Sequence, residues 1–281
     1  MDNTPSISDE NAGIQLKDIS WWFLAIILIF VWAIYIFLTR ENYQEAFNFI
    51  KIGIAVTIKT SLIAYAFAVA LGLFAGLGRI SKNIFFNNLS RLYVELIRGI
   101  PMLVLIFFIA LVGVPMFVDG INAFGAWLVS IGLGVIGAPL SGFGNRAFTM
   151  NSRAIIALSV TYGAFLAEIF RAGIQSIGRG QMEAGRSLGM SYGQTMRHII
   201  LPQAVRNVLP ALANDFVAMV KDSSLVSVLA VRDITQVSRL YAGSTFRFRE
   251  AYITVSVMYL TLTVVLSLLV QLMERRLRNN D

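Results

Sequence analysis

The chain has 281 residues, of which 57% are hydrophobic and 14% are charged. Its mean hydropathy of +0.70 is higher than a soluble domain of this length needs to fill its core. It has no cysteine and one histidine, which excludes a disulfide framework, a thiolate nucleophile and a cysteine-ligated metal and gives no basis for a histidine metal site.

Residues 1–20 contain Asp2, Asp9, Glu10 and Asp18 against Lys17 alone. A cleaved signal peptide would begin with a basic region, and no small-residue cleavage site follows the first apolar run. We therefore expect residues 1–20 to be an N-terminal tail, which the parity of the spans described below puts in the cytoplasm. Residues 21–49 should then form an additional N-terminal transmembrane span, retained as an anchor, with a loop on the outer side.

Several further segments are apolar enough to cross a bilayer, which takes roughly 20 mostly apolar residues because hydrocarbon cannot satisfy free backbone groups. With the first, the candidate spans are 21–38, 53–78, 99–117, 154–173, 204–221 and 252–270. The sequence therefore predicts an all-α fold, a polytopic transmembrane helical bundle of about six spans.

The distribution of charge predicts the orientation of this bundle. The connection 79–98 carries four Lys and Arg residues against one glutamate, and so does the connection after span 154–173 when its flank as far as Arg206 is included. Cytoplasmic loops retain positive charge, so both connections and both termini should face the cytoplasm. The net charge of +7 has the same origin and does not by itself indicate nucleic-acid binding.

The segment 121–138 is also apolar enough to span a membrane. If it crossed once, every later segment would be inverted and the second basic connection would lie outside. We therefore expect residues 118–153 to be a non-crossing insertion on the outer side, re-entrant or interfacial. Its many glycines suit irregular backbone buried against protein.

The polar stretch "MEAGRSLGMSYGQTMRHIILP" interrupts the apolar runs at 182–202. Its first part predicts a helix over 180–188 that Gly189 ends in a left-handed conformation. Ser191 and Gln194 match a capping box that begins a second helix, and Pro202 is expected to close it. A helix, a turn and a helix could also be a DNA-binding helix-turn-helix, but such a domain needs a third helix and a core of its own.

The spacing of Glu183-Ala184-Gly185, Gly189 and Leu201-Pro202 resembles the "EAA" loop of bacterial ABC importer permeases, with Gly185 where that motif usually has alanine. The segments "LYVELIRGIPMLVLIFF", "TYGAFLAEIFRAGIQSIGRGQMEAGRSLGMS", "VKDSSLVSV" and "MERRLR" are similar to the polar amino-acid uptake branch of these permeases. The resemblance covers residues 50–117 and 154–278.

This resemblance implies a permease domain over 50–278 with a cytoplasmic coupling loop at 177–203. In the family this loop lies in a groove of a separate ATP-hydrolysing subunit, a helix-in-groove contact. The residues implied in coupling are Met182, Glu183, Ala184, Gly185, Leu188, Gly189, Met190, Leu201 and Pro202.

The partners implied are two ATP-binding cassette subunits, a second permease subunit that is the same or a paralogous chain, an extracytoplasmic amino-acid-binding protein, and the lipid of a bacterial cell membrane. The chain has no Gly-Lys dipeptide and so no P-loop. We expect a transport subunit that is no enzyme and holds no cofactor, with ATP and Mg bound by the partner ATPase. The alternatives are a secondary transporter for a small polar solute and a membrane-anchored helix-turn-helix regulator.

Charges within predicted spans mark the candidate pathway or gate, since each costs about 2.5–3.5 kcal/mol at a helix centre and usually faces inward. Glu168 and Arg171 are three residues apart, so they form either an internal ion pair or part of a gate. Asn214 and Asp215 are expected at mid-bilayer, where the carboxylate could meet a substrate ammonium group. Lys221 and Asp222 are expected at the interface, and Glu95 is expected to pair with Arg98 on one helix.

Overall fold

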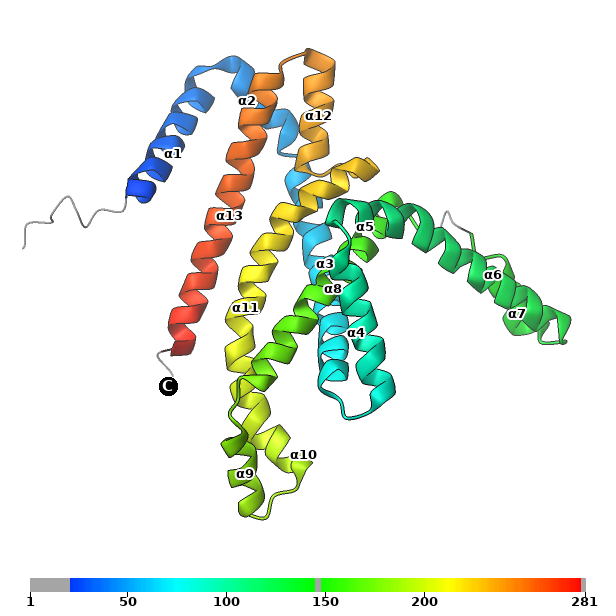
Figure 1. The fold of residues 1–281 in the computed structure, drawn as a ribbon. Coiled ribbons are helices and arrows are strands. Elements are labelled where there is room, and N and C mark those ends of the chain that lie inside the picture. The colour runs from blue at the N-terminus through cyan, green and yellow to red at the C-terminus, as the bar shows by residue number, and fades with distance from the viewer. Residues whose placement is uncertain (1–20, 145–147, 279–281) are drawn as a thin grey trace, which may run out of the picture.

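The computed structural model describes residues 21–144 and 148–278, and every regular element within them is helical (Figure 1). The elements are α1 (Trp21–Thr39), α2 (Glu41–Ile50), α3 (Gly53–Ile80), α4 (Ile84–Gly99), α5 (Met102–Phe108), η1 (Ile109–Gly113), α6 (Val114–Ser130), α7 (Gly134–Ser141), α8 (Met150–Gln175), α9 (Arg179–Ser187), α10 (Tyr192–Thr195), η3 (Met196–Ile200), α11 (Leu201–Asp222), η4 (Ser223–Leu229), α12 (Ile234–Thr245) and α13 (Phe248–Arg278). The all-α prediction is confirmed. Residues 1–20, expected to be a tail, lie outside the described residues.

Four helical stretches of the described residues are long and apolar enough to cross a membrane. They are Glu41–Ile80, Met102–Ser130, Met150–Gln175 and Phe248–Arg276, and Leu24–Thr39 is a shorter apolar helix. These stretches make the chain a multi-pass membrane protein. The total of about six crossings stays a prediction.

The centre of the bundle is the contact between α3 and α8, in which small residues bring the two backbones together. A Cβ on Gly72 would lie 2.6 Å from Cβ of Leu166, and one on Gly76 would lie 2.9 Å from the carbonyl oxygen of Ala167. Glycine therefore sets the separation of this pair, as in small-residue helix contacts within membranes. Leu158, Tyr162 and Met219 fill the buried core beside it.

Residues 79–98 are mostly helix, although the sequence predicts a connecting loop there. The turn covers only 81–83, and α4 then runs back along α3 and α8 (Figure 1). The Asn83 side chain accepts hydrogen bonds from the backbone N–H groups of Phe85 and Phe86 and so begins the helix. Mean hydropathy did not reveal this helix because it is amphipathic: one face packs inward through Val94, and another is polar.

The predicted span 99–117 is likewise divided among elements. Pro101 separates α4 from α5, and α5 continues through the π-helical η1 into α6. α6 and α7 form a hairpin that projects sideways from the bundle (Figure 1). That the segment 118–153 lies on the outer side without crossing stays a prediction.

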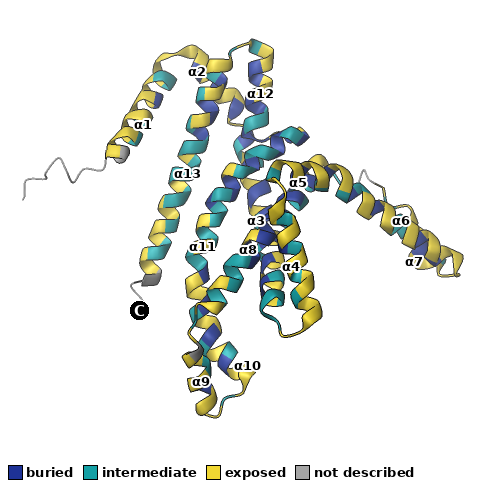
Figure 2. Cartoon of the chain, in the orientation of Figure 1, coloured by how far each residue is buried: buried dark blue, intermediate teal, exposed yellow. Residues whose placement is uncertain are grey.

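The α3–α4 turn, the α9–α10 region and the C-terminal end of α13 lie toward one end of the bundle, while α2 and α12 lie at the other (Figure 1). α1 stands apart from the rest, and exposed side chains cover most of it and of the α6–α7 hairpin (Figure 2). Buried residues are most numerous in α3 and α8 (Figure 2).

Candidate functional site

The predicted coupling loop is a short helical hairpin, α9 and α10, held between the ends of α8 and α11 (Figure 1). It projects beyond the bundle at the end that also carries the α3–α4 turn. The bounds of α9, Arg179–Ser187, differ by one residue at each end from the predicted helix over 180–188.

Gly189 ends α9 as predicted, in the left-handed conformation with φ of +81°. The N–H of Gly189 donates to the carbonyl of Arg186 at 3.0 Å, and the N–H of Met190 donates to the carbonyl of Gly185 at 3.1 Å. These two bonds form a Schellman motif, which satisfies carbonyls that the end of a helix would otherwise leave free. The conformation explains why glycine is required here.

The predicted capping box is also present. Oγ of Ser191 accepts from the N–H of Gln194 at 3.3 Å, and the Gln194 side chain accepts from the N–H of Ser191 at 2.8 Å. The prediction that Pro202 closes this helix is wrong. The chain stays helical from α10 through the π-helical η3 into α11, and Pro202 lies in the first turn of α11, where a missing N–H is tolerated.

The coupling residues divide into an exposed and a packed set. Glu183, Ala184, Leu188, Gly189, Leu201 and Pro202 are exposed, Met182 and Met190 are half-buried, and Gly185 is buried. Leu188 is 81% exposed although it is apolar, which suits a residue that packs against another subunit. A Cβ on Gly185 would lie 2.5 Å from Cγ2 of Thr195, so this glycine lets α9 pack closely on α10.

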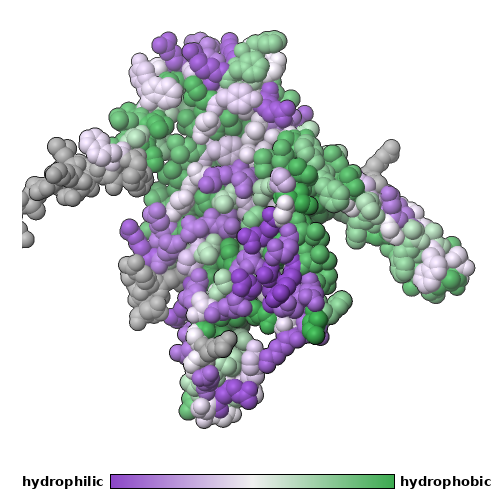
Figure 3. Space-filling view, viewed as in Figure 1, coloured by the Kyte–Doolittle hydropathy of each residue, from purple (hydrophilic) through white to green (hydrophobic). Residues whose placement is uncertain are grey.

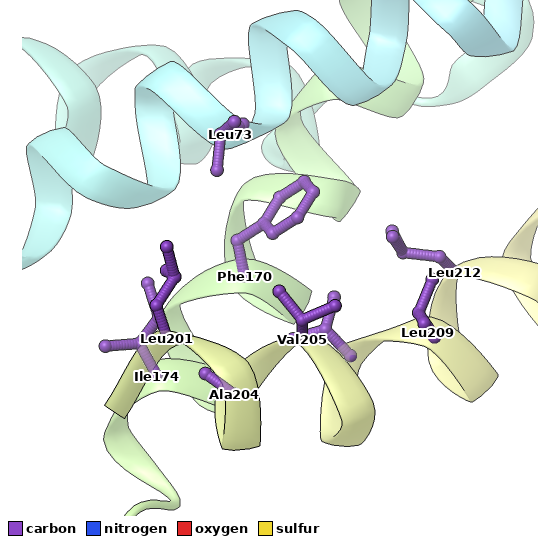
Figure 4. A pocket seen from close by; sticks show the side chains of 9 residues that line it. Leu73, Phe170, Ile174, Leu201, Ala204, Val205, Leu209 and Leu212 are labelled. Atoms are coloured by element: carbon purple, nitrogen blue, oxygen red, sulfur yellow. The ribbon is translucent and has the colours of Figure 1, made fainter. Parts of the chain in front are cut away.

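An apolar hollow of about 90 Å³ lies where the coupling loop joins the bundle (Figure 4). Its lining comes from α3, α8 and α11 and consists of Leu73, Phe170, Ile174, Leu201, Ala204, Val205, Val208, Leu209 and Leu212. Phe170 points into the space between α3 and α11, with Leu73 across from it (Figure 4). Leu201 of the predicted loop motif thus borders this hollow.

Glu168 and Arg171 form the predicted ion pair, with Oε2 of Glu168 2.8 Å from Nη2 of Arg171. Arg79 at the end of α3 adds a contact that the sequence did not indicate, because its Nη1 lies 2.9 Å from Oε1 of Glu168 and 3.6 Å from Oε1 of Glu95. The cluster therefore ties α3, α4 and α8 together. The expected pairing of Glu95 with Arg98 is wrong, since the Arg98 guanidinium lies 5.6 Å from the centroid of the Phe165 ring.

Asn214 and Asp215 lie in the second half of α11, and their mid-bilayer depth stays a prediction. Nδ2 of Asn214 donates to Oε1 of Glu274 at 3.0 Å, and Glu274 follows the apolar run of α13 at its charged end. This hydrogen bond joins α11 to α13. Oδ2 of Asp215 is buried and has no hydrogen-bond partner among the described residues. An unpaired buried carboxylate oxygen is costly unless a cation or donor reaches it.

Asp222 is placed much deeper than the interface predicted for it. Its Oδ2 accepts a hydrogen bond of 2.7 Å from the hydroxyl of Tyr162, which is 3% exposed and lies halfway along α8. Tyr65 of α3 lies nearby on the same side and donates to the carbonyl of Leu212. The sequence offered only the residue types as a signal, because the contacts join residues that are far apart in the chain.

A polar stripe on α4 is the other feature that the sequence did not reveal. Asn88, Arg91, Glu95 and Arg98 follow one another at spacings of three and four residues and are all exposed. This spacing puts them on one face of the helix. Figure 3 shows hydrophilic side chains gathered in the region of α4, flanked by hydrophobic surface. Such a face is costly against hydrocarbon and requires water or protein beside it.

Comparison with known proteins agrees with this arrangement. The family described as "Binding-protein-dependent transport system inner membrane component" matches residues 68–279. The probable glutamine ABC transporter permease protein GlnM of Bacillus subtilis (strain 168) is 38% identical over 236 residues, which are 84% of this chain and 96% of that protein. The glutamine transport system permease protein GlnP of Escherichia coli (strain K12) is 30% identical, over 80% of this chain and 91% of that protein.

Solved structures give the same result. The chain resembles one described as the crystal structure of an amino acid ABC transporter with histidines, with a TM-score of 0.68 and 33% identity over 85% of this chain and 98% of that one. The MetNI methionine ABC transporter in an inward-facing conformation shares the fold, with a TM-score of 0.60, 18% identity, and coverage of 82% of this chain and 96% of that one. The chain belongs to the family of inner-membrane components of binding-protein-dependent transport systems and is the permease subunit of an ABC importer.

Proposed function

We propose that the chain forms the transmembrane pathway of an importer for a polar amino acid. Two permease chains, the same or paralogous, would work with two ATPase subunits, which bind ATP and Mg. An extracytoplasmic binding protein would deliver the substrate. The single observation that carries this proposal is the α9–α10 hairpin, an ordered and exposed pair of helices projecting from a membrane bundle.

The hairpin suits a coupling role because it is stiff at its turn and exposes an apolar side chain beside that turn. The Schellman motif at Gly189 and the capping box at Ser191 fix both sides of the turn. Leu188 directly precedes Gly189 and is exposed, and Glu183, five residues earlier on α9, is exposed too. This combination of an apolar anchor and a charged contact fits a groove on another protein.

The pathway would run along the polar stripe of α4, facing the second permease subunit. The stripe needs a neighbour other than lipid, and a water-filled path between two subunits supplies one. Glu168 and Arg171, joined to Arg79 and Glu95, would hold the end of this path nearest the coupling loop and act as part of a gate.

An amino acid fits the charges available. The unpaired Oδ2 of Asp215 could accept from a substrate ammonium group, and Asn214 beside it could contact a polar side chain. The named relatives support this class of substrate: two are glutamine permeases, and the arginine transport system permease protein ArtQ of Bacillus subtilis (strain 168) is 30% identical over 83% of this chain.

The orientation that follows puts both termini and the coupling loop in the cytoplasm of a bacterial cell. Residues 50–278 would form the permease domain with its loop at 177–203, and residues 21–49 an added span and outer loop. The basic residues at the end with the α3–α4 turn and the α9–α10 hairpin support this orientation.

The test is transport by the complete complex in sealed vesicles, with labelled glutamine, arginine, histidine and glutamate offered in turn. Uptake should require both ATP and the binding protein. Glu183→Ala should lower substrate-stimulated ATP hydrolysis because it removes a contact with the ATPase. Uptake driven by a sodium or proton gradient without ATP would instead make the chain a secondary transporter, and binding to DNA in a mobility shift would favour the regulator.

A further inference from the structure

We propose that the groove between α1 and α13 is a binding site for an anionic phospholipid of the outer leaflet. The groove has a volume of about 420 Å³, and it is lined from α1 by Ile29 and Trp32 and from α13 by a row that begins at Arg249. The outer-leaflet assignment rests on the proposed orientation of the chain.

α1 leaves a space beside α13. α1 is apolar around its whole circumference, and among its described side chains only Ala33 is buried. It is attached to the bundle through α2, where the ring of Phe37 contacts those of Tyr43 and Phe47. Below this attachment the two helices diverge (Figure 1). Within a bilayer the space must be filled by acyl chains or by another apolar helix.

Along α13 the groove is long and mostly apolar. Tyr252, Val257 and Leu260 follow Arg249 on one face of the helix, so the groove extends about 16 Å at 1.5 Å per residue. An apolar slot of this length accommodates most of an acyl chain. Trp32 and Tyr252 are 49% and 45% exposed within it, so aromatic rings with a polar atom border the slot.

One end of the groove carries the positive charge of Arg249. Arg249 lies at the start of α13, at the end of the groove farthest from the coupling loop. Its side chain is 77% exposed, with Nη2 3.5 Å from Oε1 of Glu250. A guanidinium beside an apolar slot is complementary to a phosphate joined to an acyl chain. An apolar helix of a second permease chain would fill the slot but would offer no anionic group to Arg249. The occupant that we assign is therefore the lipid.

The experiment uses photo-crosslinking in the intact transporter, reconstituted in vesicles of equal parts phosphatidylglycerol and phosphatidylcholine. A benzophenone amino acid replaces Ile29 in the groove or, as the control position, Val265, which is 50% exposed farther along α13. At Ile29 the phosphatidylglycerol adduct should exceed the phosphatidylcholine adduct about fivefold, the preference that one basic residue near the surface gives. At Val265 the two adducts should be equal.

Arg249→Gln should reduce the ratio of phosphatidylglycerol to phosphatidylcholine adducts at Ile29 to about one. Arg276→Gln, at the opposite end of α13, should leave this ratio unchanged. A ratio of one at Ile29 in the unmodified background would overturn the proposal, and so would a crosslink from Ile29 to a second permease chain. The readout does not depend on uptake, so a failed transport assay and a failed lipid assay remain separate results.

Discussion

The hydroxyl of Tyr162 donates a hydrogen bond of 2.7 Å to Oδ2 of Asp222, which joins the last residue of α11 to the midpoint of α8. Hydrogen bonds to a charged group contribute about 1.5–3 kcal/mol, so this one can fix how the two helices that carry the coupling loop lie relative to each other.

Asp222→Asn and Tyr162→Phe should each reduce uptake by roughly tenfold, because each removes a charge-assisted hydrogen bond. The double variant should be no worse than Tyr162→Phe alone, since Asp222→Asn weakens the same contact that Tyr162→Phe removes. Uptake rates of the three variants provide the test, with Tyr35→Phe on the exposed α1 as the control. Additive losses would mean that the two residues act separately.

Asp215→Asn should leave membrane insertion unchanged but alter the transport rate or the preference among amino acids. The change removes a buried charge, which eases folding, and at the same time removes the proposed ammonium partner. Uptake of several amino acids measures the effect, and Glu41→Gln on the exposed start of α2 is the matched control. Identical kinetics for every amino acid would give Asp215 a structural role only.

Gly189→Val should insert normally yet lose substrate-stimulated ATP hydrolysis. A side chain in the left-handed conformation costs roughly 1 kcal/mol, and a β-branched one costs more, which is enough to misdirect α9. Gly193→Val is the matched control because a Cβ there also meets open space but the backbone has no positive φ. The coupling hypothesis fails if Gly189→Val retains its ATPase at full yield and transports at the normal rate.

Cysteine labelling tests the orientation. A thiol placed by Ser191→Cys should react with an impermeant reagent only from the cytoplasmic side, and one placed by Ser244→Cys only from outside. Both positions are exposed, and they lie at opposite ends of the bundle. Labelling of the first from outside would refute both the charge-based topology and the coupling role.

Gly72→Ala should lower the thermal stability of the purified complex by about 1–3 kcal/mol, because the added methyl would overlap Cβ of Leu166. Gly99→Ala should be neutral, since a Cβ there meets no atom within 4 Å. Thermal unfolding of both variants in the same detergent makes the comparison. Equal midpoints would show that α3 and α8 separate easily.

The features predicted correctly from the sequence are those that depend on neighbouring residues. The conformation of Gly189 and the capping box of Ser191 are set within four residues, so the order of residue types suffices. The position of Asp222 depends instead on where α11 lies against α8. Counting residues from a membrane boundary assumes a straight crossing, but α11 ends inside the bundle and continues as η4, after which Ala230 takes a left-handed conformation.

α4 was missed for a related reason. Its charged residues raise the local polarity to that of a loop, and only contacts with α3 and α8 identify it as part of the bundle. A search for polar residues at helical spacing over 88–98 would have suggested it. The resemblance to amino-acid permeases identified the family correctly, but it assigned no role to the polar face of this helix.

The two supports of the α9–α10 hairpin differ in stiffness. α8 packs against α3 at Gly72 and Gly76, where the two helices are so close that neither backbone can move toward the other. α11 borders the hollow around Phe170 and has room beside it. A force applied to the hairpin would therefore swing α11 while the α3–α8 pair keeps its form. Asp222 at the far end of α11 is held to Tyr162 of α8, so the swing would turn about that contact and carry the Asp215 carboxylate past a stationary wall.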